Sequence, residues 1–359
     1  MNVSVYFQLM VKKEASDLYL RTKAKPRARI NGKVDLISDH EISREEMDQI
    51  VTILLANDAR RKQFKEDLDI DFIHEEPEIG RFRINIFTQR GTPALVARHV
   101  HSKIRGFDEL NLPVEICKMF CEECKGLFIV SGPAGNGKST TIASMIQYIN
   151  DISSQHIVTI EDPIEFLFRD NKSIINQREL EIDVMSYPKA LKHVTQQSPD
   201  IIYIGNIRDV ETMRAAITAT ELGTFVMTTF HTINAVQTII RIVNFFPPHL
   251  HDEIRMQLSM ILKGTISLRL LPCKDGRGRI PAYETMVVTP TIARLIREGR
   301  IREIQNYIDD GELFGMQSFK KSLVDKVKRG LVDERDARRY ADSKDDFNLE
   351  LKGLKRHIE

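Results

Sequence analysis

A short run near the middle of the chain, residues 132–139, constrains the fold more than any other feature. It fits the phosphate-loop pattern G-x-x-x-x-G-K-S/T without a gap. Residues 126–131 before it are mainly apolar, as a buried strand is, and residues 140–149 after it repeat apolar side chains at helical spacing. This strand–loop–helix context favours nucleotide binding over a chance glycine-rich turn.

The chemistry of the loop follows from its backbone. Glycines let the chain wrap around an anion, because no side chain blocks the approach, and the free amides at a helix start attract negative charge. Lys138 can reach the β- and γ-phosphates, and the Ser139 hydroxyl can bind Mg²⁺. The sequence therefore predicts ATP and Mg²⁺ as ligands, with the nucleotide held by Gly132, Pro133, Ala134, Gly135, Asn136, Gly137, Lys138, Ser139 and Thr140.

Composition limits the class of protein. The 359 residues leave room for two domains, and their formal net charge of +1 gives no basic field for nucleic acid. No apolar stretch approaches the length of a membrane span and the N-terminus lacks a secretory signal, so we expect a cytoplasmic protein. Cys121 and Cys124 resemble half of a zinc site without a second pair; with Cys117 they fit one helix face, and no zinc is predicted.

Residues 1–105 predict a small α+β domain, followed by a linker at residues 106–113. Expected helices are residues 4–17 and 43–57, the second with Ser43 and Glu46 as a capping box. Expected strands are residues 18–29, 33–37, 71–74 and 80–89, with a hairpin turn at Asn31-Gly32. Basic residues alternate along the first strand, which favours a solvated strand face over a nucleic-acid patch: Arg21, Lys23, Lys25, Arg27 and Arg29.

From residue 114 strands alternate with helices, which predicts a parallel sheet covered by helices on both faces. The expected strands are residues 127–131, 157–160, 201–204 and 225–229, within a core domain of residues 114–290. A C-terminal helical region, residues 291–359, follows, with helices at residues 291–299, 302–309, 317–329 and 333–342. Its amphipathic segment, residues 314–327, favours packing on the core; a surface for a membrane platform or a sister subunit is the alternative.

Polar residues follow each of the four predicted core strands, where ligands bind in open parallel sheets. A phosphate-loop ATPase needs a carboxylate that polarises the attacking water and a further acceptor for the magnesium shell. Glu161, Asp162 and Glu165 are the candidates after the second strand, although acids at a helix start would give the same pattern. Asn206 and Arg208 follow the third strand, and His231 follows the fourth.

A set of further motifs occurs in one order along almost the whole chain. They are Ser16-Asp17-Leu18, Gly80-Arg81-Phe82-Arg83, Thr159-Ile160-Glu161-Asp162-Pro163-Ile164-Glu165, Asn176-Gln177-Arg178-Glu179, Arg208-Asp209, Phe246-Pro247, residues 291–298 and Met316-Gln317-Ser318-Phe319. With the phosphate loop, this combination resembles the type IV pilus retraction ATPases, the PilT/PilU group of secretion ATPases.

The resemblance implies an α/β fold in which a PAS-like N-terminal domain joins a RecA-like ATPase domain, with nucleotide between them. It implies a homohexamer beneath an inner-membrane platform protein, powering pilus retraction and twitching motility by ATP hydrolysis, with a paralogous retraction ATPase as a further partner. Glu165 then matches the general base, and Arg81, Arg83 and Arg98 match arginines that approach the phosphates. Glu161, Lys138 and His231 complete the expected catalytic set, and Asn206 and Arg208 join the nucleotide-binding set.

The chain departs from that group at a few positions. Asn206 replaces a glutamate, Thr224 replaces a histidine, and Gln196-Gln197 replaces a pair that usually contains an arginine. An amide can accept a hydrogen bond, but it cannot act as an anionic acceptor or a base.

Three interpretations of Asn206 stay open. Hydrolysis survives because Glu165 is the base; or the subunit binds ATP and hydrolyses it slowly as an accessory of an active motor; or Asn206 was introduced to trap nucleotide. Two other classes fit less well. Assembly ATPases of this superfamily carry a zinc-binding cysteine quartet and a longer N-terminal region, and a DNA translocase needs a positive channel.

Overall fold

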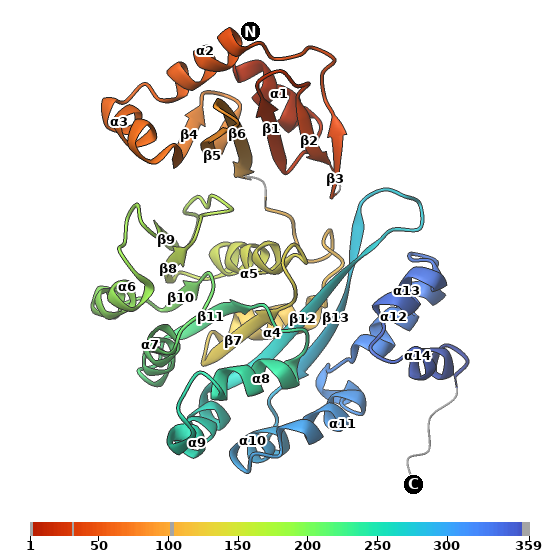
Figure 1. The fold of residues 1–359 in the computed structure, drawn as a ribbon. Coiled ribbons are helices and arrows are strands. Elements are labelled where there is room, and N and C mark those ends of the chain that lie inside the picture. Colours follow the sequence, from red (N-terminus) through yellow and green to blue (C-terminus); the bar gives the residue numbers. More distant parts are fainter. Residues whose placement is uncertain (1–2, 31, 101–103, 354–359) are drawn as a thin grey trace. The chain divides into compact units, whose positions relative to one another are not determined.

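The computed structural model describes residues 3–30, 32–100 and 104–353. The chain divides into two compact units, one formed by residues 1–103 and 165–167 and the other by residues 104–164 and 168–359 (Figure 1). Each unit contains its own sheet and its own apolar core.

The N-terminal unit is built on six antiparallel strands in the order β3-β2-β1-β6-β5-β4. They are β1 (Asp17–Arg21), β2 (Arg27–Ile30), β3 (Lys33–Leu36), β4 (Asp69–Glu76), β5 (Gly80–Gln89) and β6 (Thr92–Val100). Helices α1 (Val3–Lys12) and α2 (Arg44–Leu54) bury their apolar residues against one face of this sheet, and α3 (Asp58–Asp67) has no buried residue. Along β5 the buried residues Phe82, Ile84 and Ile86 alternate with Arg81 and Arg83, which therefore lie on the other face.

The prediction of a single strand over residues 18–29 is wrong. β1 ends at Arg21, a turn follows in which Lys23 has a φ of +56°, and β2 begins at Arg27. Pro26 has no amide to donate to a neighbouring strand, which favours a break here. The alternating basic residues therefore lie on two strands and a turn. Asn31 of the predicted hairpin turn lies outside the described residues.

Other N-terminal predictions hold in part. The Ser43 hydroxyl accepts a hydrogen bond from the Glu46 amide at 3.1 Å, which confirms the predicted cap at the start of α2. That helix is shorter than expected, and neither α3 nor β6 was predicted.

The second unit contains seven strands in the order β13-β12-β7-β11-β10-β8-β9. The parallel strands are β7 (Leu127–Ser131), β8 (His156–Glu161), β9 (Ile174–Glu179), β10 (Ile201–Ile204), β11 (Phe225–Phe230) and β12 (Leu262–Pro272), and β13 (Arg279–Val287) is antiparallel to β12. The four predicted core strands are confirmed, whereas β9, β12 and β13 were not predicted.

Helices cover both faces of this sheet (Figure 1). α4 (Val114–Glu123) and α5 (Lys138–Ile152) pack on one face. α6 (Tyr187–Val194), α7 (Val210–Glu221), α8 (Ala235–Val243) and α9 (His251–Ile261) pack on the other. Buried residues on neighbouring positions of one strand, such as Phe128 and Ile129, belong to opposite cores, as expected for a sheet covered on both sides.

The C-terminal region is helical, as predicted, with α10 (Pro290–Arg297), α11 (Ile304–Asp309), α12 (Phe319–Lys328), α13 (Glu334–Tyr340) and an unpredicted α14 (Lys344–Leu351). Short 3₁₀ turns occur at Thr195–Gln197, Pro248–Leu250, Ile301–Glu303 and Glu312–Phe314. Phe319 and Leu323 of α12 are buried against Leu271 and Ile280 of the β12–β13 pair, so this apolar stripe packs on the core unit.

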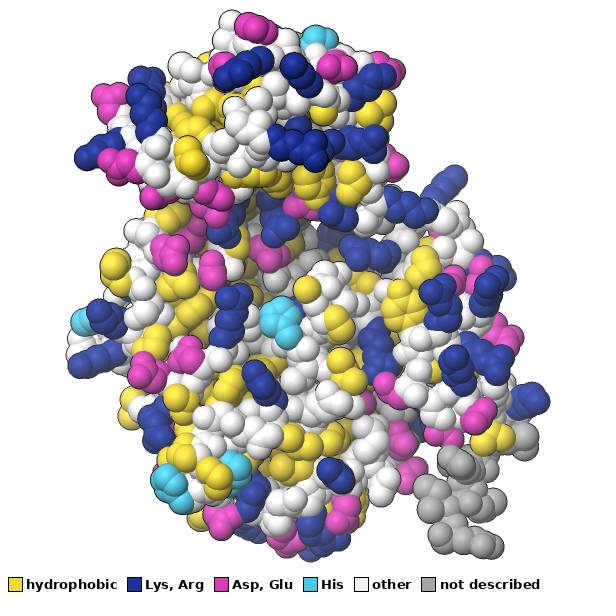
Figure 2. Space-filling model, viewed as in Figure 1, with side chains coloured by type: hydrophobic (Ala, Val, Ile, Leu, Met, Phe, Trp, Pro, Cys, Tyr) yellow, Lys and Arg dark blue, Asp and Glu magenta, His cyan; other side chains and the backbone are white. Residues whose placement is uncertain are grey.

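The described residues contain no helix that is long and apolar enough to cross a membrane. On the face drawn in Figure 2, basic and acidic side chains are intermixed, and they form no continuous basic track there.

Candidate nucleotide-binding site

The phosphate loop joins the carboxyl end of β7 to the start of α5, as the sequence predicts. Gly132 has a φ of +148°, and a β-carbon built on it would lie 2.6 Å from the Leu268 carbonyl oxygen. Gly137 caps α5 with a φ of +85°. Side chains other than hydrogen would strain both positions, so glycine is required for this loop shape.

Lys138 is already held over the loop. Its ammonium donates hydrogen bonds to the carbonyl oxygens of Gly132, at 2.8 Å, and Pro133, at 3.1 Å. The residue is only 8% exposed. Neutral carbonyl oxygens do not cancel the charge of an ammonium, so this charge can still attract a phosphate at the same place.

Two residues that the sequence did not reveal brace the loop from the β12–β13 pair. The side-chain oxygen of Asn136 accepts a hydrogen bond from the Leu270 amide at 2.7 Å. Arg279 donates to the Gly135 carbonyl oxygen at 3.1 Å. Both contacts join positions far apart in the chain, and the one local signal is the glycine-rich turn Gly276-Arg277-Gly278 before Arg279.

The two glutamates of the acidic segment are held differently. Glu161 ends β8, is 5% exposed, and accepts hydrogen bonds from the Thr159 hydroxyl at 2.6 Å and the Gln177 amide at 3.3 Å. Glu165 is exposed and makes no hydrogen bond or ion pair within the described ranges. An engaged carboxylate is a weaker candidate for a base, so Glu161 is the weaker candidate of the two.

His231 connects the phosphate loop to the end of β10. Its Nδ1 lies 3.4 Å from the Lys138 ammonium, and its Nε2 lies 3.3 Å from the side-chain amide of Asn206. Burial lowers the pKa of His231, and the charges of Lys138 and Arg208 lower it further, so the neutral ring is favoured near pH 7.

The tautomer of His231 determines how Asn206 is used. Because the Lys138 ammonium is only a donor, Nδ1 accepts and the proton lies on Nε2. The Nε2 proton then needs an acceptor, which is the side-chain oxygen of Asn206. Rotating the Asn206 amide by 180° places this oxygen beside Nε2 without changing the shape of the side chain. An amide at position 206 can thus hold His231 as a glutamate would, without supplying a negative charge.

The remaining predicted residues near these strand ends have separate roles. Asp209 caps α7 by accepting a hydrogen bond from the Thr212 amide at 2.7 Å. Arg208 is exposed beside it. The Tyr187 hydroxyl, which the sequence did not reveal, is buried close to Gly205 without a hydrogen-bond partner among the described residues, and burial raises its pKa.

Thr224 is not part of this site. It directly precedes β11, whereas His231 directly follows it, and β11 spans Phe225–Phe230. A strand of this length separates its two ends by roughly 20 Å. Thr224 lines a groove of 640 Å³ at the amino ends of the strands, together with Cys124, Asp200 and Leu222. Thr224 therefore lies at the opposite ends of the strands from the phosphate loop and His231.

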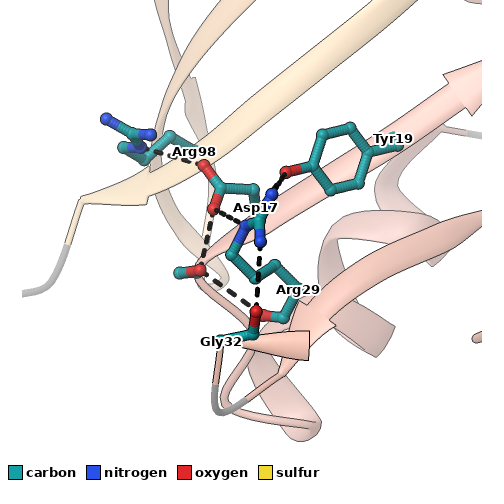
Figure 3. A network of polar contacts seen from close by, with 6 residues as sticks. Asp17, Tyr19, Arg29, Gly32 and Arg98 are labelled. Carbon is teal, nitrogen blue, oxygen red and sulfur yellow. Dashed lines mark hydrogen bonds and ion pairs between the residues drawn. The ribbon is translucent and has the colours of Figure 1, made fainter. Parts of the chain in front are cut away.

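The three predicted arginines lie on the open face of the N-terminal sheet. Arg83 and Arg98 stand directly opposite each other on β5 and β6. Arg83 is bound to Asp71 at 3.2 Å, and Arg98 is bound to Asp17 at 3.0 Å (Figure 3). The Arg81 side chain makes no hydrogen bond or ion pair within the described residues.

No group of three or more His, Cys, Asp or Glu side chains in residues 3–30, 32–100 and 104–353 is arranged to hold a metal ion. Ser139, the residue that the sequence predicts to bind Mg²⁺, lies in the first turn of α5.

The parallel sheet, the phosphate loop at its carboxyl edge and the lysine held over that loop define a phosphate-loop ATPase. Comparison with known proteins narrows this class. Residues 3–339 match the family described as Type II/IV secretion system protein, and the chain belongs to that family.

Relatives in this family match nearly the whole chain. The chain is 40% identical over 324 residues to the twitching motility protein of Neisseria gonorrhoeae, covering 90% of this chain and 86% of that protein. It is 38% identical over 347 residues to the pilus retraction ATPase PilT of Pseudomonas aeruginosa, covering 97% and 100%. With PilU of the same organism the identity is 37% over 345 residues, covering 96% and 90%.

A solved structure agrees with these matches. The crystal structure of the pilus retraction motor PilT with bound ADP has a TM-score of 0.88 and 37% identity, covering 99% of this chain and 100% of that one. The Legionella pneumophila ATPase DotB, at 22% identity and a TM-score of 0.83, supports the fold alone. The expected α/β fold and the resemblance to the PilT/PilU group are thus confirmed.

Proposed function

We propose that this protein is a motor ATPase that powers type IV pilus retraction by binding and hydrolysing ATP. One observation carries the proposal. The Lys138 ammonium is fixed by two carbonyl oxygens of its own loop, and His231 links it to Asn206 at the end of β10. A loop shaped and charged in this way binds the phosphates of a nucleotide.

Six of the predicted site residues act on the phosphates or the attacking water in this proposal. Lys138 binds the β- and γ-phosphates, and the Ser139 hydroxyl binds Mg²⁺, which neutralises charge on the phosphates when bound. Glu165 orients and polarises the attacking water. Arg81, Arg83 and Arg98 stabilise charge that develops on the transferred phosphoryl group.

We further propose the setting that the PilT and PilU relatives suggest. The subunits form a homohexamer that works in the cytoplasm at the inner membrane, against a platform protein of the pilus machine. A paralogous retraction ATPase is a second partner. The motion is a rotation of domains that bind ATP and ADP with different contacts.

A second function is favoured by one observation, the amide at position 206. Asn206 can hold His231, but it brings no negative charge to the magnesium shell. Loss of one preorganised group at a catalytic site typically costs 10²–10³ in rate. The second candidate is therefore a subunit that binds ATP, hydrolyses it slowly, and acts with an active motor.

Steady-state ATP hydrolysis by the purified protein separates the two candidates. The retraction motor is expected to turn over ATP, to lose turnover in Glu165→Gln, and to change by less than about tenfold in Asn206→Glu. An accessory subunit is expected to bind ATP without turnover and to gain about 10²-fold in Asn206→Glu. Ring formation and ATP binding are measured for every variant, because an unassembled subunit would mimic a slow one.

A further inference from the structure

Arg81, Arg83 and Arg98 share one face of the N-terminal sheet, but they are held to different degrees. The Arg81 side chain makes no hydrogen bond or ion pair within the described part of the chain. Arg83 binds Asp71 through Nε and one terminal nitrogen, at 3.5 and 3.2 Å, and that carboxylate is half exposed. Arg98 is bound through Nε alone, to a carboxylate that is only 7% exposed.

Asp17 is the acceptor for Arg98, and its place in the sheet explains its burial. On β1 it stands in register between Arg29 of β2 and Arg98 of β6. One carboxylate oxygen accepts from Arg98 Nε at 3.0 Å. The other accepts from the Ser16 hydroxyl at 2.8 Å and lies 3.3 Å from Arg29 Nε. Asp17 is thus fixed from two sides (Figure 3).

Arg29 is bound through all three of its guanidinium nitrogens and holds this cluster together. It donates to the Tyr19 hydroxyl through Nε and one terminal nitrogen, at 3.1 and 2.8 Å, and to the Gly32 carbonyl oxygen through the other, at 3.1 Å. Of the two arginines beside Asp17, only Arg98 has both terminal nitrogens without a hydrogen bond to the described residues.

The terminal nitrogens of Arg98 make no hydrogen bond to the residues that the structure describes, and its side chain is 57% exposed. Anchoring Nε fixes the plane of the guanidinium and leaves its outer fork open. That fork matches two oxygens of a phosphate. One carboxylate shared between two guanidinium groups also leaves the cluster of Arg29, Asp17 and Arg98 with a net positive charge.

We propose that Asp17 is a positioning residue, which holds Arg98 by its Nε so that both terminal nitrogens meet the γ-phosphate of ATP. The proposal rests on the proposed function, since it takes Arg98 as one of the arginines that act on the nucleotide. Asp17 itself touches no nucleotide, and Arg29 with Tyr19 keeps Asp17 in place.

A double-mutant cycle tests this role. Arg98→Ala, Asp17→Ala and the double variant are compared in kcat and KM for ATP, with ring formation and thermal unfolding measured for each. We expect Arg98→Ala to lower kcat at least tenfold with a smaller change in KM. Asp17→Ala is expected to lose nearly as much, and the double variant no more than Arg98→Ala alone, because both changes remove one interaction. Losses that multiply in the double variant would overturn the proposal.

Two matched variants separate positioning from a general effect on the fold. Asp17→Asn keeps an oxygen for Arg98 Nε, so we expect it to restore part of the kcat that Asp17→Ala loses. If Asp17→Ala does not fold, the cycle is completed with Asp17→Asn, Arg98→Ala and the double variant that carries both of these changes. Asp71→Ala removes the corresponding acceptor of Arg83, and a loss of kcat equal to that of Asp17→Ala would contradict a special role for Asp17.

A binding measurement keeps the proposal testable if the parent protein proves inactive. An arginine on the γ-phosphate favours ATPγS over ADP, so Asp17→Ala is expected to reduce the ratio of the two affinities by about as much as Arg98→Ala does. If the parent is inactive and Asp17→Ala reduces the ratio of the affinities for ATPγS and ADP, the hydrolytic function is refuted and the role of Asp17 is supported. An unchanged ratio in Asp17→Ala, with a reduced one in Arg98→Ala, would refute the role of Asp17.

Discussion

The two units hold the cations that we propose act on ATP by different means. In the core unit, Lys138 is 8% exposed and its ammonium is bound by neutral backbone oxygens. In the N-terminal unit, Arg98 has a side chain that is 57% exposed and is bound by a carboxylate. A backbone contact is specified by the fold of the loop, whereas an ion pair depends on two side chains and on ionic strength.

This difference sets what each unit can tolerate. Substitutions in the core unit should have large effects that do not depend on salt. Some of these substitutions should lower activity and others should lower stability, depending on the residue. Changes on the open N-terminal face should be smaller and should depend on whether the acidic partner is buried.

Lys138→Ala should give the largest loss. Without the ammonium the loop loses its one charged contact to the β- and γ-phosphates, and we expect turnover to fall by about 10²–10³ or more. Lys62→Ala is the matched control, because that lysine is 77% exposed and should have no effect on turnover. Steady-state hydrolysis at low and high salt is the measurement. A Lys138→Ala variant that keeps a tenth of the parent rate would contradict the assignment.

Glu165→Gln and Glu161→Gln should separate catalysis from structure within one short segment. Glu165 is exposed and unengaged in the described structure, so its loss should cost about 10² in turnover with little change in unfolding temperature. Glu161 is buried and bound by Thr159 and Gln177, so its loss should mainly lower the unfolding temperature. ATP hydrolysis and thermal unfolding are measured for both variants. If Glu161→Gln lost turnover and Glu165→Gln lost stability, Glu161 would be the catalytic residue and Glu165 the structural one.

Glu284 makes the stability of the core unit depend on pH. It is 2% exposed on β13, accepts a hydrogen bond from the Ala235 amide at the start of α8 at 2.9 Å, and burial raises its pKa from 4.5 to about 7. The folded state therefore binds a proton at Glu284 more tightly than the unfolded state does. The stability that this proton contributes is complete below about pH 4.5 and is lost as the pH rises through 7.

Glu284→Gln should therefore flatten the fall in stability between pH 5 and 8 by up to about 3 kcal/mol. Chemical denaturation of parent and variant across this range is the measurement. Glu66→Gln is the control, since that carboxylate is 65% exposed and should leave the slope unchanged. Equal slopes for parent and Glu284→Gln would show that the buried carboxylate does not titrate in this range.

The sequence predicted the core unit better than the N-terminal unit for a physical reason. A phosphate loop is local: β7, the glycines and α5 follow one another within residues 127–152, and each is set by its own pattern. The long-range braces were not predictable, because Leu270 and Arg279 meet the loop only after β12 and β13 pair beside β7.

The sequence predicted features less well where they depend on how strands are divided and paired. Alternation of basic residues indicated one strand, yet Pro26 stood within it, and that signal for a break was the stronger one. Thr224 and His231 flank one short strand, and a strand carries its two ends to opposite edges of a sheet. Asp17 stood out as part of a motif, but its role as an acceptor between two arginines needs the register of three strands.

Asp71→Asn should give the smallest effect. The Arg83–Asp71 pair is partly exposed on both sides, with side chains 32% and 50% exposed, so its loss should cost less than about 1 kcal/mol of unfolding free energy. High salt should screen even that cost, because both charges face solvent.

Asp17→Asn, on the same sheet face, is the direct comparison. Its carboxylate is 7% exposed between Arg29 and Arg98, so removing its charge leaves two guanidinium groups without a shared counter-charge. We expect a cost of about 1–3 kcal/mol, and a smaller response to salt than at Asp71. Urea denaturation of both variants at low and high salt measures the difference. Equal costs would mean that burial of the acceptor does not distinguish these pairs, and that the N-terminal sheet presents Arg83 and Arg98 as equivalent surface charges.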